Sequence, residues 1–466
     1  NIRFCATTNK AAAILNAETV HSTLGIQRNA ETHPFEKPDK HEIQNIANLF
    51  RDKDILLIDE VSMLNPEMLA LIDFKLRYGL NNQKQPFGGM HVLLVGDMVQ
   101  FPPVRQIALF QALINYSKGR PMRHEKGQGA RLFSLFQLIE LNGQQRMTKA
   151  YNRWLTKLRD MDLQLPIDDA WLKHLRVLSA QDCEDDEWLF APIAVTGHPE
   201  RRAINAHKAQ LFGNRWNEPI LRWTCAVQEG KSKSRIIWKD VDDDVIDTHA
   251  GLVRYFVRGA PCIVEERVNT KGGISKGSVG TFEGALWWDG SIRLADNGDL
   301  WINGKRVNGR GVVTRVPQPD VILMRFEHEG EQVIMPLERK GRVVEPKSSG
   351  LPRKMRIREH GCDLQFAMTY YNVQGVTLDK IVLSLNPISK ETQKIAPIAL
   401  TNLYVGLSRV HDFEEHRILY ISKEELQKLK TLTQRPLLAQ WLNNYDENGK
   451  WQQHKFSQKH QKAFFE

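Results

Sequence analysis

Two short apolar runs that end in polar residues constrain the fold of this chain more than any other feature. Residues 55–60 read Ile-Leu-Leu-Ile-Asp-Glu, and residues 92–97 read Val-Leu-Leu-Val-Gly-Asp. Runs of this kind are typical of strands that lie buried on both faces of a parallel sheet. In an open parallel sheet, ligands bind at the carboxyl ends of the strands. The sequence therefore predicts an α/β domain with a polar site after these two strands.

The residues after the two strands have the chemistry that nucleotide hydrolysis needs. Asp59 is placed to hold a water bound to Mg²⁺, and Glu60 is placed to orient a second, attacking water. Gln100 follows the second strand and is placed to contact a terminal phosphate. Two such strands in this order indicate nucleotide hydrolysis coupled to another process.

A phosphate cradle of the form Gly-x-x-x-x-Gly-Lys-Ser/Thr normally accompanies such strands. The only Gly-Lys-Ser of the chain is residues 230–232, but Cys225 stands where the first glycine belongs, and the segment follows the acidic strand instead of preceding it. We interpret it as a basic turn. Because the chain begins with Asn1 at the edge of a predicted strand, we expect it to be a fragment whose cradle lies just upstream.

Composition sets broad limits on the class of protein. A length of 466 residues predicts about three domains. The net charge of +9 fits a polyanionic partner but is also common in soluble enzymes. Five cysteines without a Cys-x-x-Cys pair argue against zinc ribbons and disulfide frameworks and indicate a reducing compartment. With neither a membrane-spanning run nor a signal peptide, we expect an intracellular protein: nuclear or mitochondrial in a eukaryote, otherwise cytoplasmic.

The first 213 residues have an alternating α/β pattern. The segments predicted as strands are residues 2–6, 54–59, 91–96 and 189–195, and those predicted as helices begin at residue 10 and cover 150–178 and 199–211.

The pattern changes between residues 214 and 360, where tryptophan, glycine and β-branched residues are frequent. Asp289-Gly290 and Asn297-Gly298 separate apolar runs, which is a strong signal for hairpins. We predict a small antiparallel β-domain here. The α/β pattern resumes at Leu364, with strands near residues 381–385 and 417–421, so the β-domain is interpreted as an insertion in a second α/β domain.

Two arginines follow apolar runs at the entry to helices. Arg146 and Arg409 are candidates for fingers that reach the γ-phosphate and stabilise the charge of phosphoryl transfer. Either arginine alone would more often form a surface ion pair. Their combination with the two polar strands favours the functional reading.

Loops near the same sheet edge carry groups that suit a nucleic-acid strand. Thr8, Lys10, His21 and Ser22 offer hydroxyl, cationic and imidazole groups for sugar and phosphate contacts, although a histidine such as His21 is more often a capping or packing residue. Basic runs with nearby Trp238 and Met355 fit a groove for single strands, but solvated faces are the commoner explanation.

Several motifs together resemble the Pif1-like helicases of superfamily 1B. The resemblance runs from residue 1 to about 421. The motifs that carry it, in the family's order, are residues 59–63, 86–89, 96–104, 145–146, 374–377 and 404–410.

The resemblance implies two RecA-like α/β domains with parallel sheets, a small SH3-like antiparallel β-domain inserted in the second, ATP and Mg²⁺ as cofactors, and 5′-to-3′ unwinding of DNA. By motif match, Asp59 is the metal ligand, Glu60 the general base and Gln100 the γ-phosphate sensor, with Arg146 and Arg409 as fingers. The further cofactor-binding positions are Gly96, Asp97, Gln374 and Gly375, and the DNA-contacting positions are Thr8, Lys10, His21, Ser22 and Thr369.

The chain departs from the family pattern mainly at DNA-facing positions. Residues 6–9 read Ala-Thr-Thr-Asn instead of Ala-Pro-Thr-Gly, and residues 369–375 lack a His, a Lys and a Ser that handle the DNA strand. Phe101 replaces a leucine. The positions that face ATP are kept, so the departures affect substrate preference more than catalysis.

The resulting domain hypothesis places a first RecA-like domain at residues 1–140, a second at 141–213 and 361–425, the β-insertion at 214–360 and a polar, basic tail at 426–466.

The leading functional hypothesis is an ATP-dependent DNA helicase in DNA repair, recombination or telomere and genome maintenance. Its expected partners are single-stranded and tailed duplex DNA, it does not bind membranes, and it is a monomer. One alternative is a catalytically inactive nucleic-acid-binding remnant, for example from a mobile element. Another is a translocase that strips proteins from DNA without unwinding it.

Overall fold

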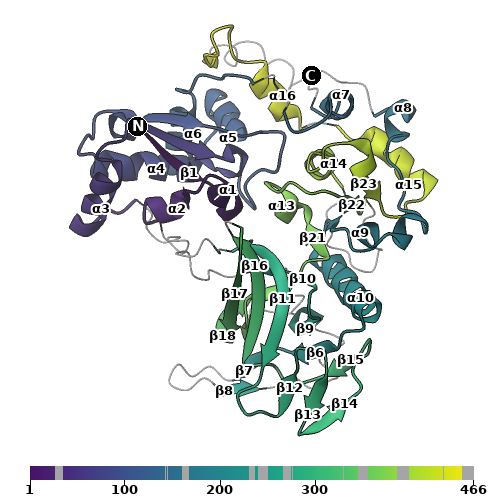
Figure 1. Ribbon diagram of the computed structural model, residues 1–466. Helices are drawn as coiled ribbons and strands as arrows, with labels where there is room; N and C mark the ends of the chain where they lie inside the picture. The colour runs from purple at the N-terminus through teal and green to yellow at the C-terminus, as the bar shows by residue number, and fades with distance from the viewer. Residues whose placement is uncertain are drawn as a thin grey trace.

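The chain folds into two α/β bodies and a β-rich region below them (Figure 1). The first α/β body is formed by residues 1–141, the second by 167–216 together with 365–433, and the β-region by 218–364. The computed structural model describes residues 1–26, 35–141, 143, 145–159, 167–229, 237–239, 250–265, 274, 276–328, 330–344, 355–385, 398–433 and 435–453.

The first α/β body contains a four-stranded, fully parallel sheet in the order β2-β1-β3-β4. The two apolar runs of the sequence form β3 and β4, as predicted. Caps fix where the helices begin: Asp39 and Glu42 form a capping box at α3, and Asn65 caps α4. The bounds are β1 (Ile2–Ala6), α1 (Asn9–Ile14), β2 (Glu18–Thr19), α2 (Val20–Thr23), α3 (Lys40–Phe50), β3 (Ile55–Asp59), η1 (Val61–Met63), α4 (Pro66–Gly79), η2 (Pro86–Gly89), β4 (His91–Leu94), α5 (Leu109–Ser117) and α6 (His124–Phe133).

The expectation that these strands are buried on both faces was wrong for the described part of the chain. Leu56 and Ile58 of β3 are buried in a core shared with α4, whereas Phe4 of β1 and Leu93 of β4 are 39% and 47% exposed. Among the described residues, the helices of this body cover one face of its sheet, so burial alternates along each strand instead of being continuous.

The second α/β body contains a parallel sheet in the order β21-β5-β22-β23, with every strand residue buried. The parallel sheet confirms the predicted fold class. Strand β5 is shorter than expected because Asp185 caps a short helix that occupies residues 186–189. The bounds are α8 (Asp169–Leu172), η3 (Asp182–Glu184), α9 (Asp186–Leu189), β5 (Ile193–Val195), α10 (His198–Trp216), β21 (Ala367–Thr369), α13 (Tyr370–Val373), β22 (Ile381–Leu383), α14 (Leu400–Leu407), η7 (Phe413–Glu415) and β23 (His416–Ile418).

The predicted helix over residues 150–178 is two helices in the structure, α7 (Lys149–Thr156) and α8. Residues 160–166 lie outside the described part. Trp154 of α7 and Trp171 of α8 stack with ring centroids 4.4 Å apart, and each indole N–H donates a 3.1 Å hydrogen bond to the other residue's carbonyl oxygen. This pair fixes the two helices to each other.

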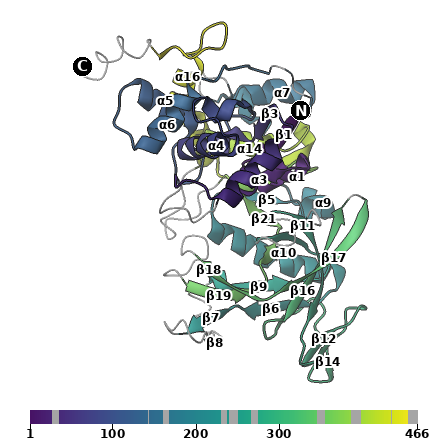
Figure 2. The ribbon, with the colours of Figure 1, turned by 90° about the vertical axis from the view of Figure 1, so that its left-hand side faces the viewer.

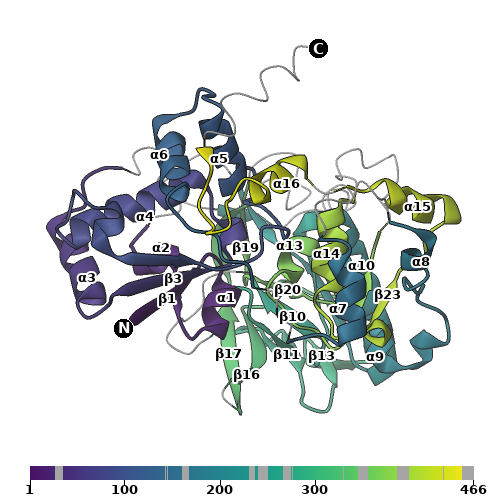
Figure 3. The same cartoon turned by 90° about the horizontal axis from the view of Figure 1, so that it is seen from above.

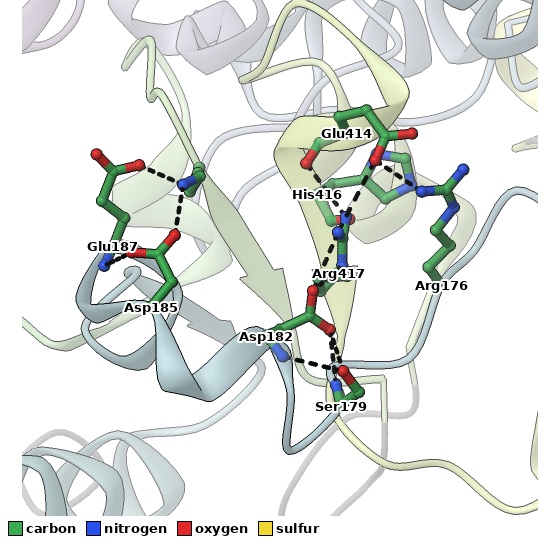
Figure 4. A network of polar contacts seen from close by, with 9 residues as sticks. Arg176, Ser179, Asp182, Asp185, Glu187, Glu414, His416 and Arg417 are labelled. Carbon is green, nitrogen blue, oxygen red and sulfur yellow. Dashed lines mark hydrogen bonds and ion pairs between the residues drawn. The ribbon is translucent and has the colours of Figure 1, made fainter.

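Polar contacts join residues 176–182 to the edge strand β23 and to the residues just before it (Figure 4). The Arg417 guanidinium donates to the carboxylate of Asp182 and lies over the Trp188 ring, 4.4 Å from its centroid. Arg176 pairs with Glu414 at 2.6 Å. The network closes this edge of the second sheet on the side away from the first α/β body.

The β-region (Figure 2) is mainly antiparallel, as the sequence predicts, and its described residues contain one parallel pair, between β15 and β6. The Asp289-Gly290 and Asn297-Gly298 turns link β11 to β12 and β12 to β13, which confirms both hairpin predictions. Strand β20 follows residue 360 but pairs with β10 inside this region. The bounds are β6 (Ile220–Thr224), β7 (Ala226–Glu229), β8 (Ile237–Lys239), η4 (Ala250–Leu252), β9 (Val253–Phe256), β10 (Pro261–Val264), β11 (Val279–Leu286), β12 (Ile292–Leu294), β13 (Leu300–Ile302), β14 (Lys305–Val307), β15 (Val313–Arg315), β16 (Val321–His328), β17 (Glu331–Glu338), β18 (Lys340–Val344), β19 (Met355–Glu359) and β20 (Cys362–Leu364).

The last described residues return from the second α/β body to the first. Helix α15 (Lys423–Lys428) and the turn η8 (Leu429–Thr431) stay with the second body, and α16 (Pro436–Leu442) packs against α5 of the first (Figure 3). Leu438 and Trp441 of α16 are buried there. Within the described residues, no helix has both the length and the apolar character that a membrane span requires.

Candidate functional site

The candidate site begins where β3 ends. Asp59 is the last residue of the strand, and its Oδ1 accepts the backbone N–H of Glu60 at 2.7 Å. Glu60 has a left-handed backbone, with φ 56° and ψ 45°, and its carbonyl oxygen accepts the Thr7 hydroxyl at 2.8 Å. Such a conformation is unfavourable for a residue with a Cβ and persists only where the surroundings fix it, most often at functional sites.

The second α/β body contacts the Glu60 carboxylate directly. The Gln374 side-chain N–H₂ donates to Glu60 Oε2 at 2.9 Å and to the Ser62 hydroxyl oxygen at 3.2 Å. Gly375 has a φ of +75°, and a Cβ there would lie 3.6 Å from Glu60 Oε1. Burial raises the pKa of Glu60, the Gln374 hydrogen bond opposes this, and the charge of Asp59 adds to it. A raised carboxyl pKa suits a group that takes up a proton during a reaction.

Gly96 and Asp97, which follow β4, lie beside this turn. Gly96 has a φ of +146°, and a Cβ there would come within 2.8 Å of the Val61 backbone nitrogen, so only glycine lets the two strand ends approach this closely. Asp97 Oδ2 accepts the Tyr404 hydroxyl of α14 at 2.6 Å, and Arg159 lies 3.6 Å from Oδ1. Asp97 is therefore a second point at which the two bodies meet.

Gln100 is part of the loop that Asp97 begins. Its backbone N–H donates to the Asp97 carbonyl oxygen at 3.1 Å. Its side-chain oxygen is buried and has no hydrogen-bond partner among the described residues. Phe101 stacks on Tyr371 of the second body, with ring centroids 4.2 Å apart. A buried amide oxygen without a partner fits a position that accepts a hydrogen bond from water or a ligand.

The two predicted arginine fingers lie together at the corner of the second body that faces Glu60. Arg409 is 3% exposed and donates to the Val405 carbonyl oxygen at 2.9 Å and to the Ser408 hydroxyl oxygen at 2.6 Å. The pKa of Arg409 is lowered to about 10, mainly by burial and also by the charge of Arg146, while the charge of Glu60 opposes both. Arg146 is exposed, and its Nη1 lies 3.5 Å from the Ser408 carbonyl oxygen.

The structure therefore brings the predicted ATP-facing residues together. Asp59, Glu60, Gly96, Asp97 and Gln100 come from the first body. Gln374, Gly375 and Arg409 come from the second, and Arg146 contacts Ser408 beside Arg409.

Of the predicted DNA-facing residues, Lys10 has the most informative position. Its ammonium donates to the Asn372 carbonyl oxygen of α13 at 2.5 Å, and a Cβ on Gly277 of the β-region would lie 3.1 Å from its Cε. Burial lowers the pKa of Lys10 to about 8. Lys10 thus stands where all three parts of the molecule meet.

The other predicted DNA-facing residues take part in local structure. The Thr8 side chain accepts the Ala11 N–H and caps α1, and Ser22 contacts the Thr19 hydroxyl at 3.1 Å in α2, which also contains His21. Thr369 ends β21 and is 8% exposed. The basic run at residues 231–235, with the Gly-Lys-Ser sequence, lies outside the described residues.

The donor set fits Mg²⁺ bound together with a phosphate ligand. Among the described residues, no group of three or more His, Cys, Asp or Glu side chains is gathered into a site for a metal ion alone. Mg²⁺ is usually held by one or two carboxylates together with waters and substrate phosphates. The Asp59 carboxylate, at the strand end beside Glu60, can supply such a ligand.

Three groups contact the site that are not among the site residues predicted from the sequence. Tyr404 bonds Asp97, Thr7 bonds the Glu60 carbonyl, and Arg435 donates to the Gln100 carbonyl oxygen at 3.0 Å. Tyr404 begins one of the motifs that carry the resemblance, and Thr7 lies in residues 6–9, which depart from the family pattern, so both positions were available as a signal. Arg435 lies in the tail, which carried no motif.

Comparisons with known proteins agree with the resemblance. Residues 2–167 match the family model described as PIF1-like helicase. The ATP-dependent DNA helicase Pif1 of Psychrobacter sp. (strain PRwf-1) is 34% identical over 99 residues, which are 21% of this chain and 15% of that protein. The ATP-dependent DNA helicase PIF1 of Saccharomyces cerevisiae (strain YJM789) is 35% identical over 106 residues, which are 22% and 12% of the two proteins. The chain thus spans less than a quarter of the length of these relatives.

Solved structures extend the likeness to the whole fold. The structure of Pif1 helicase from Bacteroides in complex with ADP-AlF3 and ssDNA has a TM-score of 0.61 at 20% identity and covers 97% of this chain and 89% of its own. Pif1 helicase from Candida albicans has a TM-score of 0.58 at 16% identity and covers 95% and 88%. The resemblance to the Pif1-like helicases is confirmed, by sequence over residues 2–167 and by fold over almost the whole chain.

Proposed function

We propose that this chain, which resembles the Pif1-like helicases in sequence and fold, is the motor of an ATP-dependent DNA helicase that moves 5′ to 3′ along a single strand and unwinds duplex DNA. One observation carries the proposal. The carboxylate of Glu60, at the end of a strand in the first α/β body, is held by Gln374 of the second and lies near Arg409. The candidate catalytic groups of both bodies therefore meet at one point.

In the proposed mechanism, Glu60 takes the proton of the attacking water. Burial raises its pKa toward the working range of a base, and Gln374 fixes the direction of its carboxylate. Gln100 orients the terminal phosphate or the water, and Arg146 and Arg409 stabilise the charge that develops during transfer. When bound at Asp59, Mg²⁺ supplies electrostatic stabilisation of the phosphate oxygens.

Coupling to movement follows from the same contacts. Gln374 to Glu60 and Tyr404 to Asp97 are hydrogen bonds across the two bodies, so a change in their separation changes the geometry of the site. The reverse also holds, because coupling between two sites is reciprocal for binding free energies. A nucleotide that favours one separation therefore drives a step of the bodies along a bound strand.

For the DNA, we propose a path past Lys10, between the α/β bodies and the β-region. Lys10 contacts α13 and approaches Gly277 of the β-region, so it lies beside every part that would hold a DNA strand. Affinity for single-stranded and tailed duplex DNA should fall steeply with salt, because neutralised phosphates release counterions. We further propose a monomeric, intracellular protein that acts in DNA repair, recombination or telomere and genome maintenance.

The test uses protein expressed from the complete open reading frame, beside the 466-residue chain. We expect the former to unwind a duplex with a 5′ single-stranded tail, to leave a duplex with a 3′ tail intact, and to hydrolyse ATP faster when single-stranded DNA is present. The measurements are fluorescence unwinding and phosphate release.

Three other outcomes would contradict the proposal. DNA-stimulated hydrolysis without unwinding would identify a translocase, and DNA binding without hydrolysis would identify an inactive remnant. Unwinding from the 3′ tail would reverse the proposed direction.

A further inference from the structure

The C-terminal segment, residues 435–453, is fastened to the first α/β body although it follows the second in the chain. Trp441 stacks on Phe133 at 6.1 Å with an interplanar angle of 14°. Gln440 accepts the Lys118 ammonium at 3.1 Å, and the carbonyl oxygen of Gly449 accepts the Leu138 N–H at 2.8 Å. The segment therefore ties together two bodies that otherwise meet at the candidate site.

Arg435, at the head of this segment, holds the loop that contains Gln100. A single nitrogen, Nη2, donates to the carbonyl oxygens of Met98 and of Gln100, the latter at 3.0 Å. The guanidinium also lies 5.3 Å from the centroid of the Phe110 ring, at the start of α5. The side chain thus links α16, α5 and the loop.

The loop over residues 97–101 is held at three places by parts of the chain that follow it. Tyr404 bonds its first residue, Asp97, and Tyr371 stacks on its last, Phe101. Arg435 bonds the backbone between them. Without Arg435, the carbonyl oxygens of Met98 and Gln100 lose their cationic partner, and the loop between Asp97 and Phe101 is held only at its two ends.

Arg435 is poorly suited to a role in stability alone. Its Nε and Nη1 are buried and have no hydrogen-bond partner among the described residues. Buried donors without acceptors cost free energy, and an apolar side chain in contact with Phe110 would avoid that cost. What the guanidinium provides, and an apolar side chain cannot, is a donor for the two loop carbonyls.

We infer that Arg435 is a positioning residue for the phosphate-sensing loop, which it holds from a segment that follows the second body in the chain. The inference rests on the proposed function for the role of Gln100. The geometry of the loop itself can be tested without it.

The first test measures loop order in the 466-residue chain by hydrogen–deuterium exchange. The reporters are the amides of Val99 and Gln100, which donate to Asp97. Arg435→Ala should speed their exchange about tenfold while β3 and α4 stay protected. Arg435→Lys should restore most of the protection, because one ammonium can serve the two carbonyls that Nη2 serves. Gln440→Ala, which weakens the segment but leaves the loop contacts, is the matched control.

The second test uses the protein from the complete reading frame. It separates the positioning role of Arg435 from the proposed function of the chain. Arg435→Ala should lower kcat for ATP about tenfold, with KM and thermal midpoint little changed, and Arg435→Lys should recover activity. If loop exchange and kcat are unchanged in Arg435→Ala while the parent hydrolyses ATP, the positioning role is wrong. If the loop loosens as expected but no parent protein hydrolyses ATP, the positioning stands and the proposed function fails. If Arg435→Ala speeds amide exchange equally throughout the protein, Arg435 has only a structural role and the inference is overturned.

Discussion

At the scale of single residues, Glu60 combines several features that destabilise the folded state with a candidate catalytic position. Its backbone is left-handed, its side chain is half-buried, and this burial raises the pKa of its carboxyl group. Each of these features costs free energy in the folded state. They are compensated by contacts from Thr7 and Gln374, which fix the turn and the carboxylate.

The first prediction concerns Glu60→Gln in the protein from the complete reading frame. The amide keeps the shape but cannot take up a proton, so turnover should fall by about two orders of magnitude or more, while nucleotide binding stays nearly intact. Because a neutral side chain avoids the burial cost of a carboxylate, the thermal midpoint should stay constant or rise. Phosphate release and fluorescent-nucleotide binding measure the two effects. Turnover within a few-fold of the parent would mean that Glu60 is not the base.

At the scale of elements, one of the contacts that hold the C-terminal segment is a close backbone approach at Gly449. Gly449 has a φ of +69°, and a Cβ on it would lie 2.1 Å from the Leu138 carbonyl oxygen. Its own carbonyl oxygen accepts the Leu138 N–H. Any side chain at this position must therefore displace the turn and break that bond.

The second prediction is that Gly449→Ala loosens the segment more than backbone strain alone explains. Gly304→Ala is the matched control, because Gly304 has a similar φ of +75° but open space around it. Left-handed strain should cost the control about 1 kcal/mol. Gly449→Ala should lower the thermal midpoint further and expose Trp441, which a shift of tryptophan fluorescence would report. Equal effects of the two variants would contradict the clash.

The third prediction concerns β23 and its buried His416, which is 0% exposed and donates from Nε2 to the His174 carbonyl oxygen at 3.1 Å. Burial lowers its pKa from 6.5 to about 4. Between these pH values the unfolded chain binds a proton that the folded chain does not, so stability falls as the pH decreases through this window. The loss from pH 7 to pH 5 should be about 2 kcal/mol from this residue.

Urea unfolding at pH 7 and pH 5, compared with His416→Gln, measures this contribution. The variant lacks a titrating group at the position, so its stability should change less between the two pH values. An identical change in both proteins would show that another group, such as the similarly buried His360, controls acid sensitivity.

At the scale of the whole molecule, the α/β bodies and the β-region contribute to different sites. The groups gathered at the candidate nucleotide site come from the α/β bodies and the segments that join them, whereas the β-region approaches Lys10 through Gly277. Under the proposed function, this arrangement separates a motor from a part that guides DNA.

The fourth prediction is that removal of the β-region impairs unwinding more than DNA-stimulated ATP hydrolysis. The deletion should cover residues 218–364, since β20 pairs with β10 and would be left without a partner by a cut at residue 360. Unwinding of a 5′-tailed duplex and phosphate release are measured on the same preparation, with Glu60→Gln in the intact protein as the variant that loses both. Hydrolysis that collapses while unwinding survives would refute the division of labour.

The sequence alone determined the local features of the fold, namely the strands, their polar ends and the hairpin turns, because these depend on residues that are close together in the chain. Apolar runs that end in Asp59 and in Gly96-Asp97 place strands and their polar ends, because alternation and turn chemistry act locally. The Asp289-Gly290 and Asn297-Gly298 hairpins were predicted for the same reason.

Tertiary structure decided which distant groups meet. Gln374 reaches Glu60 from 314 residues away, Tyr404 reaches Asp97, and Arg435 reaches Gln100 from a tail without a motif. No local pattern encodes these contacts, since they depend on how two separately folded bodies pack. The same reason explains why the face of β4 with Leu93 was expected to be buried but is exposed. An apolar strand can be covered on one face or on both, and only packing determines which faces are covered.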